Sequence, residues 1–182
     1  MKTIRTLQIL INLLYFTLIG VFTMITVYYL ILIIAPDILP KFFQMQSMMF
    51  SVFDWKFFLG PLLSFINFGL FIYAIYLLKK LIPFFKSADF YSTTVINNLK
   101  TTGKIFIFIG LSMTIFKLTM LLVVQNFMAF GGGYQWWNVL FVLLGTIDFA
   151  MVCLIIIGLF FLLFSDTYRS AGKLKAENDL TI

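Results

Sequence analysis

The chain has 182 residues, of which 62% are hydrophobic and 11% are charged, and its formal net charge is +6. So apolar a composition excludes a water-soluble globular domain and indicates an integral membrane protein. Histidine is absent and the seven acidic residues are scattered, so we expect no enzyme, no metal and no cofactor. Cys153 is the only cysteine, which excludes an intramolecular disulfide.

Four apolar runs each supply the roughly 20 residues that a helix needs to cross a bilayer. None shows the period-two alternation of the strands in a membrane barrel. We therefore predict an all-α integral membrane protein, a single domain built as an antiparallel bundle of four transmembrane helices. The predicted spans cover residues 7–34, 57–82, 104–128 and 138–164.

The first run follows Lys2 and Arg5 and is far longer than the about 7 to 15 apolar residues of a signal peptide, which indicates a retained signal anchor. Pro36 is expected to end this helix. Residues 35–56 then place polar side chains at spacings of three and four among aromatic residues and methionines. This pattern predicts an amphipathic helix at the outer interface, which either caps the bundle or forms a lid over a ligand.

The connector between the second and third spans is basic and aromatic. Pro83 discourages a straight continuation of the second span, and residues 87–89 are typical of a turn. Ser92 or Thr93 is expected to cap a short cytoplasmic helix, with Gly103 as a hinge before the third span. The lysines here predict contact with anionic lipid of the inner leaflet, at about 1 kcal/mol per nearby cation. Without a motif for reading nucleic acid, we expect no direct contact with one.

Lysine and arginine beside the spans are unequally distributed. Two of them, Lys41 and Lys56, lie in the first connector, against ten at the amino terminus, in the second connector and in the tail. The positive-inside rule therefore predicts a multi-pass protein of the cell (inner) membrane with both termini in the cytoplasm. All three tryptophans then fall at the outer boundary, where an aromatic belt is expected.

Lys117 lies near the centre of the third run, where a lone ammonium group costs about 2.5 to 3.5 kcal/mol on insertion scales. Asp148 of the fourth run lies at a comparable depth by helical rise, so we predict an intramembrane ion pair between antiparallel neighbours. Thr23, Asn67 and Thr114 could extend it into a polar layer. The pair either locks two helices in register or lines a cavity that responds to protonation, an ion or a small ligand. A third alternative is neutralisation by another subunit.

The tail, residues 165–182, is expected to continue the fourth helix beyond the membrane and to end near Glu177-Asn178-Asp179. Its mixed charges fit a protein surface better than lipid alone, and its last residues add apolar anchors. The alternative is a tail that folds back over its own cytoplasmic connector. The residues predicted to contact a cytoplasmic protein are Arg169, Lys173, Asp179, Leu180 and Ile182.

The stretch LKAENDLTI, within Lys173 to Ile182, resembles the ending LKxENDLTI of a bacterial membrane-protein family, number twenty-nine seventy-five among the domains of unknown function. Residues 84–103 are similar to the family's middle connector, with Asp89-Phe90 in place of its usual glycine-containing turn. The family has no assigned activity, but its members are often encoded beside a small helix-turn-helix regulator, and the resemblance implies such a partner. We therefore expect a small regulatory or sensory membrane protein. The alternative is a transport or ion-pathway protein that uses Lys117 and Asp148.

Overall fold

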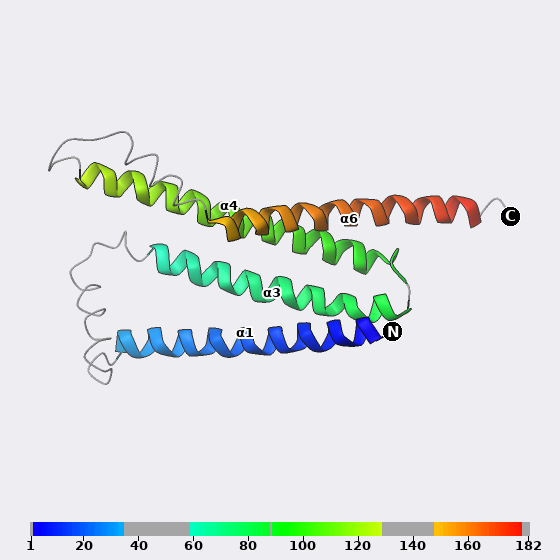
Figure 1. Ribbon diagram of the computed structural model, residues 1–182, viewed down its shortest axis with the longest axis horizontal. Helices are drawn as coiled ribbons and strands as arrows, with labels where there is room; N and C mark the ends of the chain where they lie inside the picture. The colour runs from blue at the N-terminus through cyan, green and yellow to red at the C-terminus, as the bar shows by residue number, and fades with distance from the viewer. Residues whose placement is uncertain (1, 35–58, 88, 129–147, 180–182) are drawn as a thin grey trace. The chain divides into compact units, whose positions relative to one another are not determined.

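The structure, a computed structural model, describes residues 2–34, 59–87, 89–128 and 148–179 (Figure 1). No strand occurs in these ranges, and each of their four long helices is long and apolar enough to cross a membrane. This confirms the predicted all-helical class and supports a multi-pass membrane protein. The predicted outer interfacial helix, residues 35–56, lies outside the described residues. The helices are α1 (Lys2–Ile34), α3 (Leu59–Ser87), α4 (Thr93–Met128) and α6 (Phe149–Asp179).

Helix α3 continues through Pro83 to Ser87, five residues beyond the expected end of the second span at residue 82. Proline removes one hydrogen bond from the helix, and the loss is offset here because Leu81 and Ile82, just before it, are buried. The end of α3 is then closed by polar contacts. The Ser87 hydroxyl donates to the carbonyl groups of Pro83 and Phe84, at 3.3 and 3.2 Å.

Helix α4 begins at the predicted cap. The Ser92 hydroxyl accepts a hydrogen bond from the backbone N–H of Thr94 at 3.2 Å. The predicted short cytoplasmic helix is the first part of α4, because the helix runs through Gly103 without a break. Packing explains why this glycine is not a hinge. A Cβ atom at Gly103 would lie 2.7 Å from the carbonyl oxygen of Gly158, so α6 holds the backbone at this point.

The chain divides into two compact units, residues 1–79 and residues 80–182. In the first unit, α1 and the larger part of α3 pack through aromatic rings. Phe22 lies 4.5 Å from Phe65, and Tyr15 lies 6.1 Å from Tyr76, measured between ring centres. The residue numbers rise on one helix as they fall on the other, so these two helices run in opposite directions. No residue is buried in the most apolar part of α1, as expected of a helix that faces lipid.

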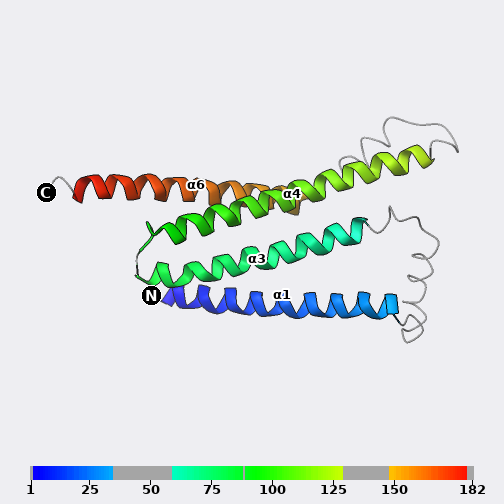
Figure 2. The same ribbon diagram turned by 180° about the vertical axis from the view of Figure 1, so that it is seen from behind.

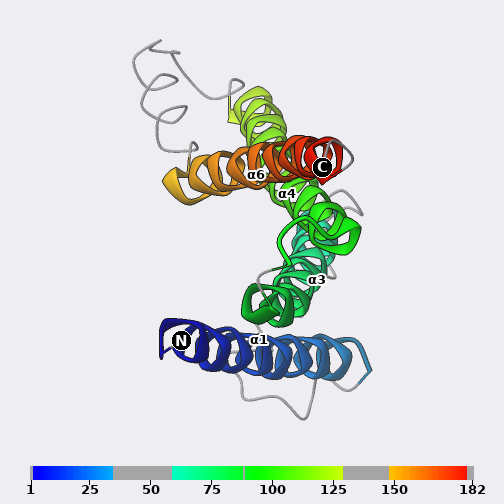
Figure 3. The same ribbon diagram turned by 90° about the vertical axis from the view of Figure 1, so that its right-hand side faces the viewer.

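In the second unit, α4 and α6 lie side by side, as the opposite views of Figures 1 and 2 agree, and the view along the long axis shows that they cross (Figure 3). The contacting positions are seven residues apart on each helix, and their numbers rise along α4 as they fall along α6. Ile96 accepts a 3.0 Å hydrogen bond from Ser165, Gly103 faces Gly158, and a Cβ atom at Gly110 would lie 2.9 Å from the carbonyl oxygen of Met151. Small residues at this spacing let two membrane helices approach at backbone distance. We call this contact the glycine seam.

Candidate functional site: an ion pair at one end of the glycine seam

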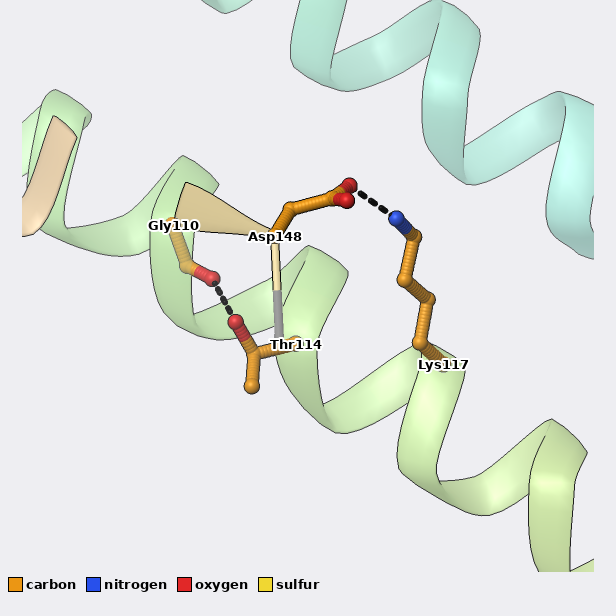
Figure 4. Close-up of polar contacts among 4 residues, drawn as sticks. All are labelled: Gly110, Thr114, Lys117 and Asp148. Atoms are coloured by element: carbon orange, nitrogen blue, oxygen red, sulfur yellow. Dashed lines mark hydrogen bonds and ion pairs between the residues drawn. The ribbon is translucent and has the colours of Figure 1, made fainter. Parts of the chain in front are cut away.

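Lys117 lies on α4 seven residues after Gly110, on the face that carries the glycine seam. Its ammonium group contacts the carboxylate of Asp148, which immediately precedes α6 (Figure 4). The structure therefore brings together the two residues whose comparable depths suggested an ion pair. The contact is direct, with no other side chain between the two charged groups.

Asp148 is the N-cap of α6. The predicted span over residues 138–164 had instead placed it within a helix. Its carbonyl oxygen accepts hydrogen bonds from the N–H groups of Met151 at 2.9 Å and Val152 at 3.2 Å. Aspartate is favoured at this position, where its backbone carbonyl accepts the first hydrogen bonds of the helix. A negative charge at a helix N-terminus is also stabilised by the helix dipole, by about 0.3 to 1 kcal/mol.

The side chains of Lys117 and Asp148 are 38% and 44% exposed. Among the described residues, one side of the pair is therefore open to its surroundings. A fully enclosed pair would serve only as a structural lock, whereas an open pair also remains within reach of protons, ions, lipid headgroups or another chain. The geometry thus permits both roles, and the function of the pair stays a prediction.

Two of the three residues predicted to extend the ion pair into a polar layer bond to the backbone of their own helices. The Thr114 hydroxyl donates at 2.7 Å to Gly110, one turn earlier on its own helix, and not to the ion pair (Figure 4). The Thr23 hydroxyl likewise donates to the backbone of α1. Asn67 is buried at 2% exposure and belongs, with Thr23, to the first unit. Threonine hydroxyl groups commonly satisfy themselves on their own helix in this way, so their depth alone did not indicate a network.

The tail packs on its own connector through one face. The ring of Tyr168 lies 6.2 Å from Phe90 and 6.5 Å from Tyr91. Further along, a Cβ atom at Gly172 would lie 3.4 Å from the Cβ atom of Tyr91, and the Lys175 ammonium lies 5.9 Å from the centre of that ring. We call this contact the tail clasp. It corresponds to the alternative in which the tail folds back over its connector.

The residues predicted to contact a partner protein divide into two groups. Arg169, Lys173 and Asp179 are exposed, while Leu180 and Ile182 lie outside the described residues. Helical geometry places Arg169 and Lys173 about 100° around α6 from Tyr168 and Gly172, because each follows one of them by one position. The clasp therefore leaves this side of the tail free of the connector.

Sequence reasoning missed the glycine seam, although the sequence carries a signal for it. Gly103, Gly110 and Lys117 repeat at seven residues, and so do Gly158, Ser165 and Gly172. Two such repeats in neighbouring spans predict an antiparallel contact of small residues. The tail clasp joins aromatic residues far apart in the sequence, and no local pattern indicates their pairing.

The described residues contain no group of three or more histidine, cysteine, aspartate or glutamate side chains that could hold a metal ion. No family model, no curated protein and no solved structure matches this chain.

Proposed function

We propose that this protein is a small regulatory or sensory membrane protein that presents the cytoplasmic part of α6 to a soluble partner protein. The observation that carries the proposal is the continuity of α6. The helix runs unbroken from Phe149 to Asp179 and passes from an apolar stretch into a charged one. About 15 of its residues follow Phe164, which corresponds to roughly 22 Å of helix beyond the apolar stretch. A lipid anchor needs no such ordered extension.

The side of this extension away from the tail clasp has the character of a protein-binding surface. It is exposed and carries both signs of charge, together with an apolar side chain, Leu174, that is 62% exposed. Mixed charge suits recognition of a protein surface, whereas a purely basic face would suit anionic lipid. We call it the outer tail face. Its residues are Asp166, Arg169, Ser170, Lys173, Leu174 and Glu177.

The ion pair supplies a sensory input to the same helix. Asp148 caps one end of α6 and the outer tail face lies towards the other, so a change at Lys117 acts on the element that the partner contacts. Loss of the carboxylate charge, by protonation or by a competing ion, removes the attraction that holds the start of α6 to α4.

The topology completes the proposal. The distribution of lysine and arginine supports an inner-membrane protein with both termini and the connector before α4 in the cytoplasm, so that its four helices cross the membrane in alternating directions. The outer tail face then lies in the cytoplasm. The first candidate partner is the small helix-turn-helix regulator that the resemblance of the tail implies, with anionic lipid of the inner leaflet as a second contact.

The test is capture of the partner from solubilised membranes with the tagged full-length protein. Reversing two charges on the outer tail face, with Arg169→Glu and Lys173→Glu, is expected to lower the capture of the regulator at least about tenfold. The matched control reverses Lys100 and Lys104 on α4, because it changes the net charge equally and leaves the tail intact. Equal capture by the tail variant and the wild type would refute the proposed surface.

A second candidate function, an ion pathway, is favoured by the exposure of the ion pair. Charged groups that remain accessible within a membrane protein often mark routes for ions or protons. Purified protein in liposomes is then expected to conduct protons or small cations, and Asp148→Asn is expected to abolish the flux. A flux no greater than that of protein-free liposomes excludes this candidate and leaves the regulatory one.

A further inference from the structure

A second charged group is held inside the first unit, where Lys79 of α3 meets the aromatic residues of α1. Its ammonium nitrogen lies 4.9 Å from the ring centre of Tyr15 and 5.0 Å from that of Phe16. Both distances are within the roughly 6 Å over which a cation is attracted to an aromatic face. The ring of Tyr76 lies 6.1 Å from that of Tyr15 and enlarges the cluster.

The position of Lys79 shows that this contact is not the ordinary end of a membrane helix. Lysine at a helix end usually extends its ammonium group towards water. Here α3 continues for eight more residues, to Ser87, which is about two further turns. The next residue, Lys80, is exposed, whereas Lys79 is partly buried. Lys79 is therefore turned into the aromatic cluster although solvent-facing positions exist beside it.

Asn12 adds a hydrogen-bond acceptor that this lysine leaves unused. Its side-chain oxygen is buried and has no hydrogen-bond partner. Asn12 precedes Tyr15 and Phe16 by three and four residues, so the three side chains share one face of α1. A buried acceptor without a donor is unfavourable, and an ammonium N–H group that reached it from the ring cluster would supply the missing donor.

We propose that Asn12, Tyr15, Phe16 and Tyr76 form a binding site for a protonated primary amine, which Lys79 fills in this structure. The rings attract the positive charge, and the Asn12 oxygen accepts an N–H group that a quaternary ammonium lacks. The tethered lysine meets only the first requirement, whereas an untethered amine meets both. The amine belongs either to a small molecule or to the headgroup of phosphatidylethanolamine. This inference involves no residue of α6 and does not rest on the function proposed above.

The test follows the tyrosine rings directly in the full-length protein. The protein is labelled with 3-fluorotyrosine, placed in phosphatidylcholine nanodiscs and titrated with ethylammonium chloride while its fluorine NMR spectrum is recorded. The signals are assigned with Tyr15→Phe and Tyr76→Phe. The signals of both tyrosines are expected to shift saturably as ethylammonium is added. Lys79→Gln is expected to raise the affinity about tenfold, because it removes a tethered competitor, and the matched control Lys80→Gln is expected to leave it unchanged.

The role of Asn12 is tested with a second cation and a second lipid. Wild-type protein is expected to bind ethylammonium more tightly than tetramethylammonium, and Asn12→Leu is expected to abolish this preference while retaining binding through the rings. If phosphatidylethanolamine nanodiscs give the shifted signals without added amine, the ligand is the headgroup; if not, it is a small amine. The absence of any saturable shift in both the wild type and Lys79→Gln would overturn the proposal. So would an unchanged preference in Asn12→Leu.

Discussion

Replacing Asp148 with asparagine separates the charge of the ion pair from the capping of α6. Asparagine caps a helix about as well as aspartate, so the start of α6 is preserved. The substitution leaves Lys117 without its counter-charge, and an unpaired lysine in hydrocarbon costs about 2.5 to 3.5 kcal/mol. Because the two side chains are 38% and 44% exposed, polar surroundings recover part of this cost. We expect a loss of about 1 to 3 kcal/mol in the free energy of unfolding.

The assay is thermal unfolding of the purified protein in detergent, with accumulation in membranes as a second measurement. A chain of this size loses about 2 to 4 °C in melting temperature for each kcal/mol. Adding Lys117→Gln to Asp148→Asn is expected to restore most of the loss, because no charge then remains unpaired. The exchange of Lys117→Asp with Asp148→Lys is expected to restore less, because it places a cation at the N-terminus of α6.

Three comparisons decide whether this reasoning holds. Asp148→Ala removes the charge and the cap together, so it is expected to cost about 1 kcal/mol more than Asp148→Asn. If Asp148→Asn is as stable as the wild type and only Asp148→Ala is impaired, residue 148 acts as a cap and the ion pair contributes nothing. If the single variant and the double neutral variant unfold at the same temperature, the two side chains are not coupled.

Further predictions concern the seam, the clasp, the tail and the topology. Gly103→Ala is expected to lower the free energy of unfolding by about 1 to 3 kcal/mol through overpacking. The control Gly20→Ala, whose Cβ atom would meet nothing within 4 Å, is expected to be neutral or slightly stabilising. Equal effects of the two substitutions would disprove the seam. Tyr168→Ala is expected to open the tail clasp and raise the rate of tail proteolysis in membranes, and an unchanged rate would show that the clasp does not protect the tail. Deleting residues 179–182 is expected to leave insertion intact and to abolish capture of the regulator, a result contradicted by retained capture. Reporter fusions to the carboxyl terminus are expected to be active only in the cytoplasm, and external activity would reverse the orientation.

The sequence predicted the helices through the length of the apolar runs, but not all of their ends. Run length is a local property, and the roughly 20-residue requirement applies to each span separately. The continuation of α3 past Pro83 and of α4 past Gly103 depends instead on what is buried beside each residue. Local signals at these positions favour a break, and packing between distant segments overrides them.

The candidate site could be predicted only where depth in the membrane was sufficient information. Depth placed Lys117 and Asp148 near each other, and the structure has them in contact. Depth also suggested Thr114, whose hydroxyl instead bonds to its own helix, because a carbonyl one turn away competes with any partner across the bundle. The contact of Lys79 with Tyr15 could not be predicted from the sequence, since the lysine has an adequate alternative role as a topology signal.

The glycine seam gives α6 the mechanics of a lever with unequal arms. Gly158, where the backbones of α4 and α6 meet, lies ten residues from Asp148 and 21 residues from Asp179. At the helical rise per residue, these arms measure about 15 Å and about 32 Å. A tilt about Gly158 that displaces Asp148 by about 1 Å therefore displaces Asp179 by about 2 Å. The end of α6 that is proposed to meet a partner therefore moves about twice as far as the end that carries the ion pair.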